Sequence, residues 1–373
     1  MRVAVVAEYY PREDDPVLGI WAHRQALAAQ EAGAQIVVFV LERMVGRAGG
    51  RIRLARHRRE GALDGIEIHH VPYLSPPRPI SYAQWGWFAA AALRHAVRRA
   101  GHFDLVHAHN AVPAGDAVLR ARLGLPLVVS VHGGDVLWTV TRVPRGAQVV
   151  RRVLGAAQLV LANSGGIERI ARENGGRVTR VVHLGSDLPA AVTRSPTPLI
   201  ASLGHLVARK GHADVLRALV GVPTARYLIV GDGPEQARLR ALASELDIAD
   251  RVDLAGQLPH PEALRRVREA WLFAMPSTAE AFGVAYIEAM AAGVPAIGCA
   301  GEPGPEEIAA AGEGMILVPP GDPATLAATL QALLADERRR EELGNAARIT
   351  VAGAFTWEEC GRQTLAAYGS VIG

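Results

Sequence analysis

Short apolar runs rich in valine and isoleucine alternate with longer amphipathic stretches along most of the chain. Such runs are typical of strands buried on both faces, and the stretches between them are typical of helices that cover a parallel sheet. The alternation predicts an α/β fold of doubly wound parallel sheets. In the first half of the chain the predicted strands are Arg2–Ala7, Gln35–Val40, Ile66–Val71, Asp104–His107, Leu127–Val131 and Gln158–Ala162. In the second half they are Leu199–Leu203, Tyr227–Val230, Val252–Ala255, Trp271–Met275, Ala296–Cys299 and Met315–Val318.

The pattern is interrupted at Thr193–Pro198, a segment with two prolines and no hydrophobic periodicity. Such a segment is typical of a linker between domains. We therefore predict two Rossmann-like domains, residues 1–192 and residues 193–355. Near the end of the chain, Thr356 is a residue type that caps helices, and apolar positions on one face follow it. This pattern predicts a final helix within residues 356–373.

Composition narrows the class of protein. A length of 373 residues suits two domains of ordinary size. Cys299 and Cys360 are the only cysteines, too few for a disulfide framework or a cysteine-rich metal site. No apolar run approaches the ~18 residues that span a bilayer, and the first residues lack an export pattern. These features predict a cytoplasmic protein.

A dinucleotide-binding dehydrogenase is the first alternative for a Rossmann-like chain, and it requires a glycine-rich turn directly after a strand. The residues that follow the first predicted strand, Glu8 to Asp14, contain no glycine. The later turn Gly231-Asp232-Gly233 is too short, and proline follows it. The sequence therefore argues against a dehydrogenase.

Two glutamates, Glu280 and Glu288, lie eight residues apart across a predicted junction from loop to helix. The helical pattern begins at about Gly283, after the loop that leaves the strand Trp271–Met275. Such a junction offers backbone N–H groups and the positive end of a helix dipole, which suit a phosphate. One carboxylate can then face a transferring group while the other accepts hydrogen bonds from ribose hydroxyls. A solvated helix flanked by surface acids is the alternative interpretation.

The segment from Glu280 to Glu288 resembles the E-x7-E signature of the family 4 retaining glycosyltransferases, which have the two-domain GT-B fold. Four further segments resemble other parts of that family in the expected order: Val131–Asp135, His183–Asp187, Leu199–Gly211 and Leu228–Glu235. The resemblance implies two Rossmann-like domains that face across a cleft, with the final helix packed back on the N-terminal domain. It also implies retaining transfer of a sugar from a nucleotide-diphosphate sugar, uridine before guanosine, to a hydroxyl acceptor. No metal or cofactor is expected, and the implied chemistry is a front-side displacement.

The resemblance assigns roles to individual residues. Lys210, the only lysine of the chain, would neutralise the diphosphate. Glu280 would contact the donor sugar, Glu288 the ribose, and His132 the anomeric carbon, with Lys210, Glu280 and His132 as the catalytic residues. The other donor-binding residues would be Gly19, His205, Arg209, Gly231, Asp232, Gly233, Ala281, Phe282, Gly283 and Val284. On the acceptor side the candidates are His109 and Asp135. A surface lysine, a turn glycine and a structural histidine are the alternatives for Lys210, Gly19 and His132.

One position departs from the family pattern. Where the family has an arginine after the strand Leu199–Leu203 and its glycine, this chain has His205. Three alternatives could complete the contact with the diphosphate: protonated His205, Arg209, or backbone N–H groups of residues 282–284. The departure leaves the diphosphate contacts open and does not change the expected reaction class.

Two N-terminal segments suggest an anionic membrane surface as a partner, and hence a lipid-linked or cell-envelope polysaccharide precursor as the acceptor; a soluble acceptor such as a small metabolite is the alternative. Residues 43–59 hold seven arginines, and residues 81–100 carry aromatic residues followed by basic ones. An aromatic and basic helix is typical of a membrane interface. The alternative is a basic loop beside a helix whose tryptophans are buried. The formal charge of +3 and the pI of 9.1 favour lipid mildly, and no nucleic-acid-binding motif is present.

Two other functions stay open. A sugar-nucleotide epimerase of the same fold would share the donor site and need no acceptor. A two-lobed sugar-binding protein without catalytic activity would share the hinged halves. Isomerisation of a donor incubated alone identifies the epimerase, and binding without turnover identifies the binding protein.

Overall fold

The computed structural model describes residues 1–48, 51–54, 60–77, 81–190 and 193–372. Contacts within the chain group residues 1–184 with 357–373 into one unit and residues 185–356 into a second. The predicted boundary after residue 192 therefore lies inside the second unit. The N–H of Ser186 donates to the carbonyl of Phe355, and Ser186 also forms a β-bridge with Thr356. These contacts explain why the second unit begins before the proline-containing segment.

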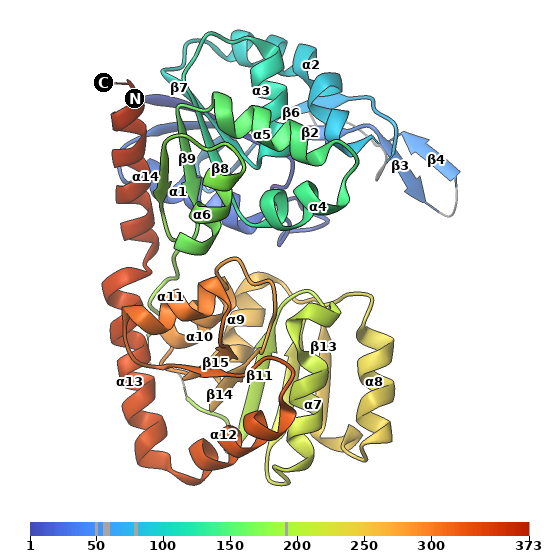
Figure 1. Ribbon diagram of the computed structural model, residues 1–373, viewed down its shortest axis with the longest axis vertical. Helices are drawn as coiled ribbons and strands as arrows, with labels where there is room; N and C mark the ends of the chain where they lie inside the picture. Colours follow the sequence, from blue (N-terminus) through green and yellow to red (C-terminus); the bar gives the residue numbers. More distant parts are fainter. Residues whose placement is uncertain (49–50, 55–59, 78–80, 191–192, 373) are drawn as a thin grey trace. The chain divides into compact units, whose positions relative to one another are not determined.

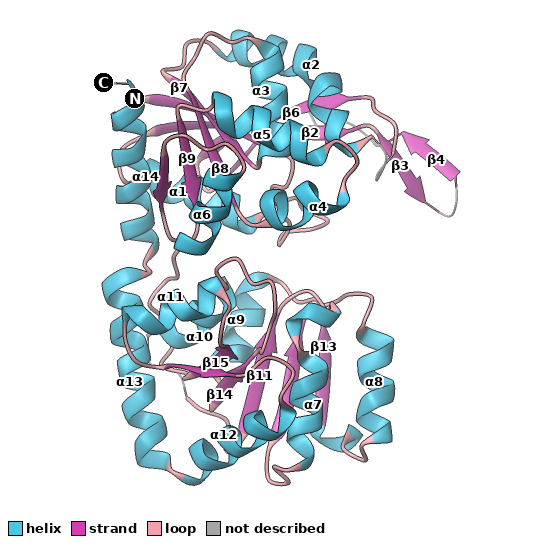
Figure 2. Cartoon of the chain, in the orientation of Figure 1, coloured by secondary structure: helices cyan, strands magenta, loops and turns pink. Residues whose placement is uncertain are grey.

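The first unit has an eight-stranded sheet in the order β10-β9-β8-β7-β1-β2-β6-β5. All neighbouring strands are parallel except β5, which pairs antiparallel with β6. Helices cover both faces of this sheet (Figure 2). The strands are β1 (Arg2–Ala7), β2 (Gln35–Arg43), β5 (Glu60–Leu63), β6 (Ile66–Tyr73), β7 (Leu105–His109), β8 (Leu127–Val131), β9 (Leu159–Ala162) and β10 (Thr179–Val181). A separate antiparallel hairpin is formed by β3 (Val45–Ala48) and β4 (Arg51–Leu54).

The final helix of the chain, α14 (Trp357–Ile372), belongs to the first unit and packs against α1 (Ile20–Glu31). Gln25 on α1 donates to Thr364 on α14, and the backbone of Gly361 lies against the carbonyl of Ala28. The other helices and helical turns of this unit are η1 (Tyr82–Gln84), α2 (Trp85–Ala100), η2 (Ala111–Gly115), α3 (Asp116–Ala121), η3 (Gly134–Thr139), α4 (Val140–Arg142), α5 (Gly146–Ala156) and α6 (Gly165–Glu173).

The second unit has a six-stranded sheet in the order β13-β12-β11-β14-β15-β16, with every neighbouring pair parallel. Its strands are β11 (Leu199–Leu203), β12 (Arg226–Val230), β13 (Val252–Gly256), β14 (Leu272–Ala274), β15 (Ala296–Cys299) and β16 (Met315–Val318). Its helices and helical turns are η4 (Ala208–Lys210), α7 (His212–Val220), α8 (Gln236–Glu245), η5 (Ala249–Arg251), α9 (His260–Arg268), α10 (Val284–Ala291), α11 (Pro303–Ala311), α12 (Pro323–Ala335) and α13 (Glu337–Ala354).

Both sheets confirm the predicted α/β fold of doubly wound parallel sheets, and every predicted strand overlaps an observed one. The strands are continuous apolar runs because helices bury them on both faces; β1, for example, is buried from Val3 to Ala7. Parallel strands place their carboxyl ends at one edge, where the loops to the next helices collect polar side chains. In the described part of the chain, no helix is both long and apolar enough to cross a bilayer.

Candidate functional site

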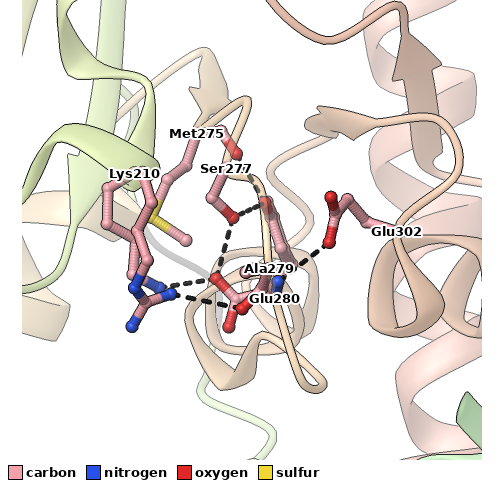
Figure 3. Close-up of polar contacts among 8 residues, drawn as sticks. Lys210, Met275, Ser277, Ala279, Glu280 and Glu302 are labelled. Carbon is pink, nitrogen blue, oxygen red and sulfur yellow. Dashed lines mark hydrogen bonds and ion pairs between the residues drawn. The ribbon is translucent and has the colours of Figure 1, made fainter. Parts of the chain in front are cut away.

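Lys210 and Glu280 meet at the carboxyl edge of the second sheet. The Lys210 Nζ donates to the Glu280 Oε2 at 2.5 Å, and the Ser277 hydroxyl donates to the same oxygen at 2.8 Å (Figure 3). The backbone N–H of Glu280 donates to the carboxylate of Glu302 at 2.9 Å. Lys210 comes from η4, after β11, whereas Glu280 comes from the loop after β14, the strand beside β11. Adjacent strands therefore bring together the two residues that the sequence assigned to the donor.

Both side chains of this ion pair are enclosed by protein, with 13% of Lys210 and 9% of Glu280 exposed. Burial alone would raise the pKa of Glu280, but the charge of Lys210 and hydrogen bonds from Lys210 and Ser277 together hold it below its ordinary value. The carboxylate is therefore ionised at neutral pH. A buried charge without its partner is costly, so each side chain depends on the other or on a ligand group that replaces it.

Glycines let the loops of this edge pack backbone against backbone. Gly211 has φ of 72°, and a Cβ there would lie 2.3 Å from the carbonyl oxygen of Pro276. A Cβ at Gly231 would lie 2.0 Å from the Gly204 carbonyl, and one at Gly233 2.5 Å from that of Leu206. These contacts give Gly231 and Gly233 a packing role that needs no ligand. The carboxylate of Asp232, between them, accepts from the N–H of Gly233.

The helix α10 begins one residue after Gly283, which is left-handed with φ of 94°. This is the predicted junction from loop to helix, and its first turn carries no acidic residue. Phe282 is buried, so its side chain anchors the turn in the core, while Ala281 and Val284 are half-buried. The positive end of the helix dipole thus lies close in sequence to Glu280, an arrangement that suits an anionic ligand.

Glu288 lies in the second turn of α10 and is almost fully buried. Its Oε1 is 2.8 Å from the Nε2 of His260, the first residue of α9. Because an ionised carboxylate is only an acceptor, Nε2 of His260 carries the proton in this contact. The contact orients Glu288.

The residues proposed to complete the diphosphate contacts differ in their surroundings. His205 is exposed. Arg209 is also exposed; its side chain donates to the carbonyl of Ala279 at 3.4 Å, and its own carbonyl accepts from the N–H of Thr278 at 2.7 Å. Ala279 is left-handed, with φ of 54°, which is uncommon for a residue with a Cβ. Arg209 therefore holds the loop that precedes Glu280.

In the first unit, His132 follows β8 and His109 ends the neighbouring β7. The Nδ1 of His109 is 3.0 Å from the Nε2 of His132, and the two ring planes differ by only 2°. The second nitrogen of each ring is buried and has no hydrogen-bond partner among the described residues. His107, two residues earlier on β7, contacts the hydroxyls of Tyr368 and Ser130, each at 2.7 Å. The sequence candidates His109 and His132 therefore form a directly bonded pair.

Burial controls the charge of this histidine cluster. It lowers the pKa of His132 to about 4 and that of His107 to about 3. Burial and the two neighbouring histidines hold the pKa of His109 well below its ordinary value. All three rings are neutral near pH 7, so His132 brings no charge to its surroundings.

Asp135 lies in the first turn of η3 and is buried. Its carboxylate accepts from the backbone N–H groups of Ala111 at 3.1 Å and Val112 at 3.4 Å. Burial nevertheless raises the pKa of Asp135 to about 7. The two backbone contacts make Asp135 a link between the loops after β7 and β8.

Gly19, predicted to approach the donor phosphates, is the N-cap of α1 with φ of 64°. A Cβ at this position would lie 2.2 Å from the carbonyl oxygen of Tyr9. The close packing of the loop between β1 and α1 therefore requires glycine here on its own account.

The two segments predicted to face a membrane differ in outcome. Residues 49–50 and 55–59 of the basic segment 43–59 lie outside the described residues. In the segment 81–100, Tyr82 and Trp85 are buried, so the alternative of a core helix holds for them. Trp87, in contrast, is 61% exposed.

Four residues around the donor-side candidates were not singled out in the sequence: His260, Ser277, Tyr286 and Glu302. The hydroxyl of Tyr286 donates to the carbonyl of Met275 at 2.5 Å and lies 3.1 Å from the Ser277 oxygen. No motif marks these residues. Only the folded structure identifies them, because it brings them next to Glu280 and Glu288.

Family models match almost the whole chain. Residues 19–188 match the model described as Glycosyltransferase Family 4, and residues 189–350 match Glycosyl transferases group 1. Among curated proteins, D-inositol 3-phosphate glycosyltransferase 1 of Catenulispora acidiphila is 31% identical over 350 residues, covering 83% of this chain and 82% of the relative.

A mannosyltransferase of Corynebacterium glutamicum, named as GDP-mannose-dependent and acting on a monoacylated phosphatidylinositol monomannoside, is 29% identical, covering 64% of this chain and 68% of the relative. Among solved structures, Anabaena Alr3699/HepE in complex with UDP-glucose superposes with a TM-score of 0.75 at 20% identity, covering 99% of both chains.

Proposed function

The chain belongs to the family 4 glycosyltransferases and has the GT-B fold, and from this premise we propose that it is a retaining hexosyltransferase that uses a UDP-sugar. The acceptor is a hydroxyl group, and the proposed molecule that carries it is a lipid-linked or cell-envelope polysaccharide precursor. UDP is the nucleotide in the HepE complex, whereas the Corynebacterium relative is named for GDP-mannose, so the choice of base is the finer part of the proposal.

The observation that carries the proposal is the buried contact between Lys210 and Glu280 beside the first turn of α10. In the bound state Lys210 contacts the diphosphate, and Glu280 accepts hydrogen bonds from hydroxyls of the donor sugar. One charge pair at 4 Å is worth roughly 4 kcal/mol at an effective dielectric near 20. The interaction accelerates transfer only to the extent that it strengthens as charge develops on the leaving oxygen. Glu288, oriented by His260, accepts from the ribose.

The proposed transfer is a front-side displacement without a metal. The bond between the anomeric carbon and the diphosphate oxygen breaks, and the acceptor oxygen bonds to the same face of the sugar. The acceptor proton moves to a leaving phosphate oxygen, so no protein base is required. Neutral His132 contacts the sugar near the anomeric carbon, and its ring is held by the bond to His109. No covalent sugar–enzyme intermediate forms, and finding one on Glu280 would overturn this mechanism.

The deciding experiment is a panel of nucleotides and nucleotide sugars screened by thermal shift and then by turnover. A ligand present at 100 times its Kd stabilises the folded chain by about 2.7 kcal/mol, which raises the melting temperature measurably. We expect UDP and a UDP-hexose to do this more strongly than GDP and GDP-mannose. Release of UDP with retention at the anomeric carbon supports the transferase. Isomerised donor without transfer would identify an epimerase instead.

A further inference from the structure

Three neighbouring helices of the first unit, α2, α3 and α5, carry a strong excess of positive charge. Helix α2 packs against α3, and α3 packs against α5 (Figure 1). Residues 85–100, 116–122 and 146–156 together hold seven arginines and a single acidic residue, Asp116. Asp116 is fully buried and is bonded to Arg120 and Arg152, so its charge is already balanced. The outward surface of these helices is therefore cationic.

An exposed tryptophan lies on the same helices. Trp87 and Arg94 are seven residues apart on α2, and Ala91 and Arg98 occupy the same stripe because side chains at i, i+4, i+7 and i+11 share one helix face. Trp87 is 61% exposed, whereas Trp85, two residues earlier, is 4% exposed and belongs to the core. The indole of Trp87 packs edge-on against Phe88, with the ring centroids 4.9 Å apart. A large aromatic side chain is thus exposed to solvent at the start of a basic helix.

A groove of about 610 Å³ runs between this stripe and the end of α3. Its lining combines aromatic carbon with guanidinium groups: Trp87, Phe88, Ala90, Ala91, Arg94, Arg120 and Arg122. Arg94 also donates to the carbonyl of Ala121, so the groove has a fixed wall, while Arg122 is exposed. An amphipathic ligand with an anionic head and an apolar body matches this lining.

We propose that the surface formed by α2, α3 and α5 docks on an anionic phospholipid bilayer, with Trp87 inserted at the level of the headgroups. Indole rings are favoured at the boundary between water and hydrocarbon, and arginines near the surface are attracted to anionic headgroups. Charge alone would also attract a nucleic acid or an acidic protein. The exposed indole beside the arginines favours a bilayer, because burying it there adds a contribution that charge does not supply. The proposal does not depend on the proposed transferase activity, since docking needs no donor.

The test is co-sedimentation of the full chain with vesicles of phosphatidylcholine that contain about 30% phosphatidylglycerol, compared with pure phosphatidylcholine. The wild-type chain should bind the anionic vesicles and be released as salt rises from about 0.1 M to about 0.5 M. Replacing three exposed arginines (Arg98→Gln, Arg99→Gln, Arg122→Gln) should weaken binding by about 100-fold, since each contributes roughly a factor of five. Trp87→Ala should weaken it by about tenfold and abolish the blue shift of tryptophan emission.

Matched variants of the second unit separate this surface from a general effect of charge or exposed carbon. The variant Arg226→Gln, Arg240→Gln, Arg338→Gln removes the same charge, and Ile349→Ala removes a side chain that is 72% exposed. Both should bind the vesicles like the wild type. Equal losses in both triple variants would overturn the proposal. Retained binding of Trp87→Ala, together with tight binding of the wild-type chain to heparin, would identify a polyanion partner instead.

Discussion

Lys210 and Glu280 form a direct ion pair, with Nζ and Oε2 2.5 Å apart. The proposed function assigns them to different parts of the same donor, the diphosphate and the sugar. A bound donor must therefore replace this ion pair with contacts of its own or extend it. Each charge of the pair compensates the other, and both lie close to where the proposed function needs them.

The first prediction concerns activity. Glu280→Ala should lower the transfer rate by at least ~100-fold, equivalent to ~2.7 kcal/mol, because contacts to the sugar hydroxyls are lost and Lys210 loses its orienting partner. Lys210→Ala should reduce both donor affinity and rate, and Lys210→Arg should recover only part of the loss, since a guanidinium does not replace a compact ammonium. Steady-state kinetics with the donor identified by the panel measures this. Near-normal turnover of Glu280→Ala would remove it from the mechanism.

The same pair predicts a non-additive effect on stability. Lys210→Met or Glu280→Gln alone leaves one buried partner uncompensated and should cost about 3 kcal/mol. The double variant removes both charges and should be more stable than the sum of the single losses implies. Thermal melting of the three variants in the absence of ligand gives the comparison. Additive losses would mean that the two charges do not interact in solution.

A third prediction isolates the role of His260. Its contact with Glu288 orients the carboxylate that the proposal assigns to the ribose, so His260→Ala should raise the KM for the donor by about tenfold, with kcat changed by less than about twofold. Arg265→Ala is the matched control on the same helix, because Arg265 is exposed and pairs with Glu269. A fall in kcat at unchanged KM would place Glu288 elsewhere in the reaction.

The fold was predictable because most buried strands are short continuous apolar runs that alternate with longer amphipathic stretches. Strands that lack this pattern were not predicted: β10 is only partly buried, and β5 is an exposed edge strand that the Asp64-Gly65 turn connects to β6. The Asp-Gly dipeptide is a hairpin signal that could have revealed β5.

The candidate site was predictable only as far as local motifs reach. The sequence marks Lys210 and Glu280 separately, each after a predicted strand, but their contact depends on β11 and β14 being neighbours, which no local pattern states. The partners Ser277 and His260 depend in the same way on tertiary packing. The sequence marked Gly19, Gly231 and Gly233 as ligand-binding residues. In the structure, the close packing of the loops is by itself sufficient to require glycine at each of these positions.

The fourth prediction is a loss of stability in acid. The pKa values of His107, His109 and His132 lie below 6.5 in the folded chain, so the unfolded chain binds protons more readily as pH falls. The stability that these neutral histidines contribute is fully present above about pH 6.5. As pH drops toward 4, the free energy of unfolding falls by up to ~1.4 kcal/mol per pH unit for each histidine. Asp135 has a raised pKa and acts in the opposite direction, which offsets one histidine.

Urea unfolding at several pH values between about 4 and 7 measures this dependence. His132→Gln should reduce the slope of unfolding free energy against pH by the contribution of one histidine. His95→Gln, at an exposed position on α2, should leave that slope unchanged. An unaltered slope in His132→Gln would show that the ring is charged or solvated in the folded chain.

The last prediction uses two glycines of α14 that differ only in their surroundings. A Cβ at Gly361 would lie 2.1 Å from the carbonyl oxygen of Ala28 on α1, whereas a Cβ at Gly369 meets nothing within 4 Å. Gly361→Ala should therefore separate the two helices and cost about 1–3 kcal/mol. Gly369→Ala should stabilise by about 0.5–1 kcal/mol, because alanine loses less backbone entropy in a helix. Shifts of opposite sign in thermal melting are expected, and a stabilising Gly361→Ala would mean that α14 does not pack on α1 through this glycine.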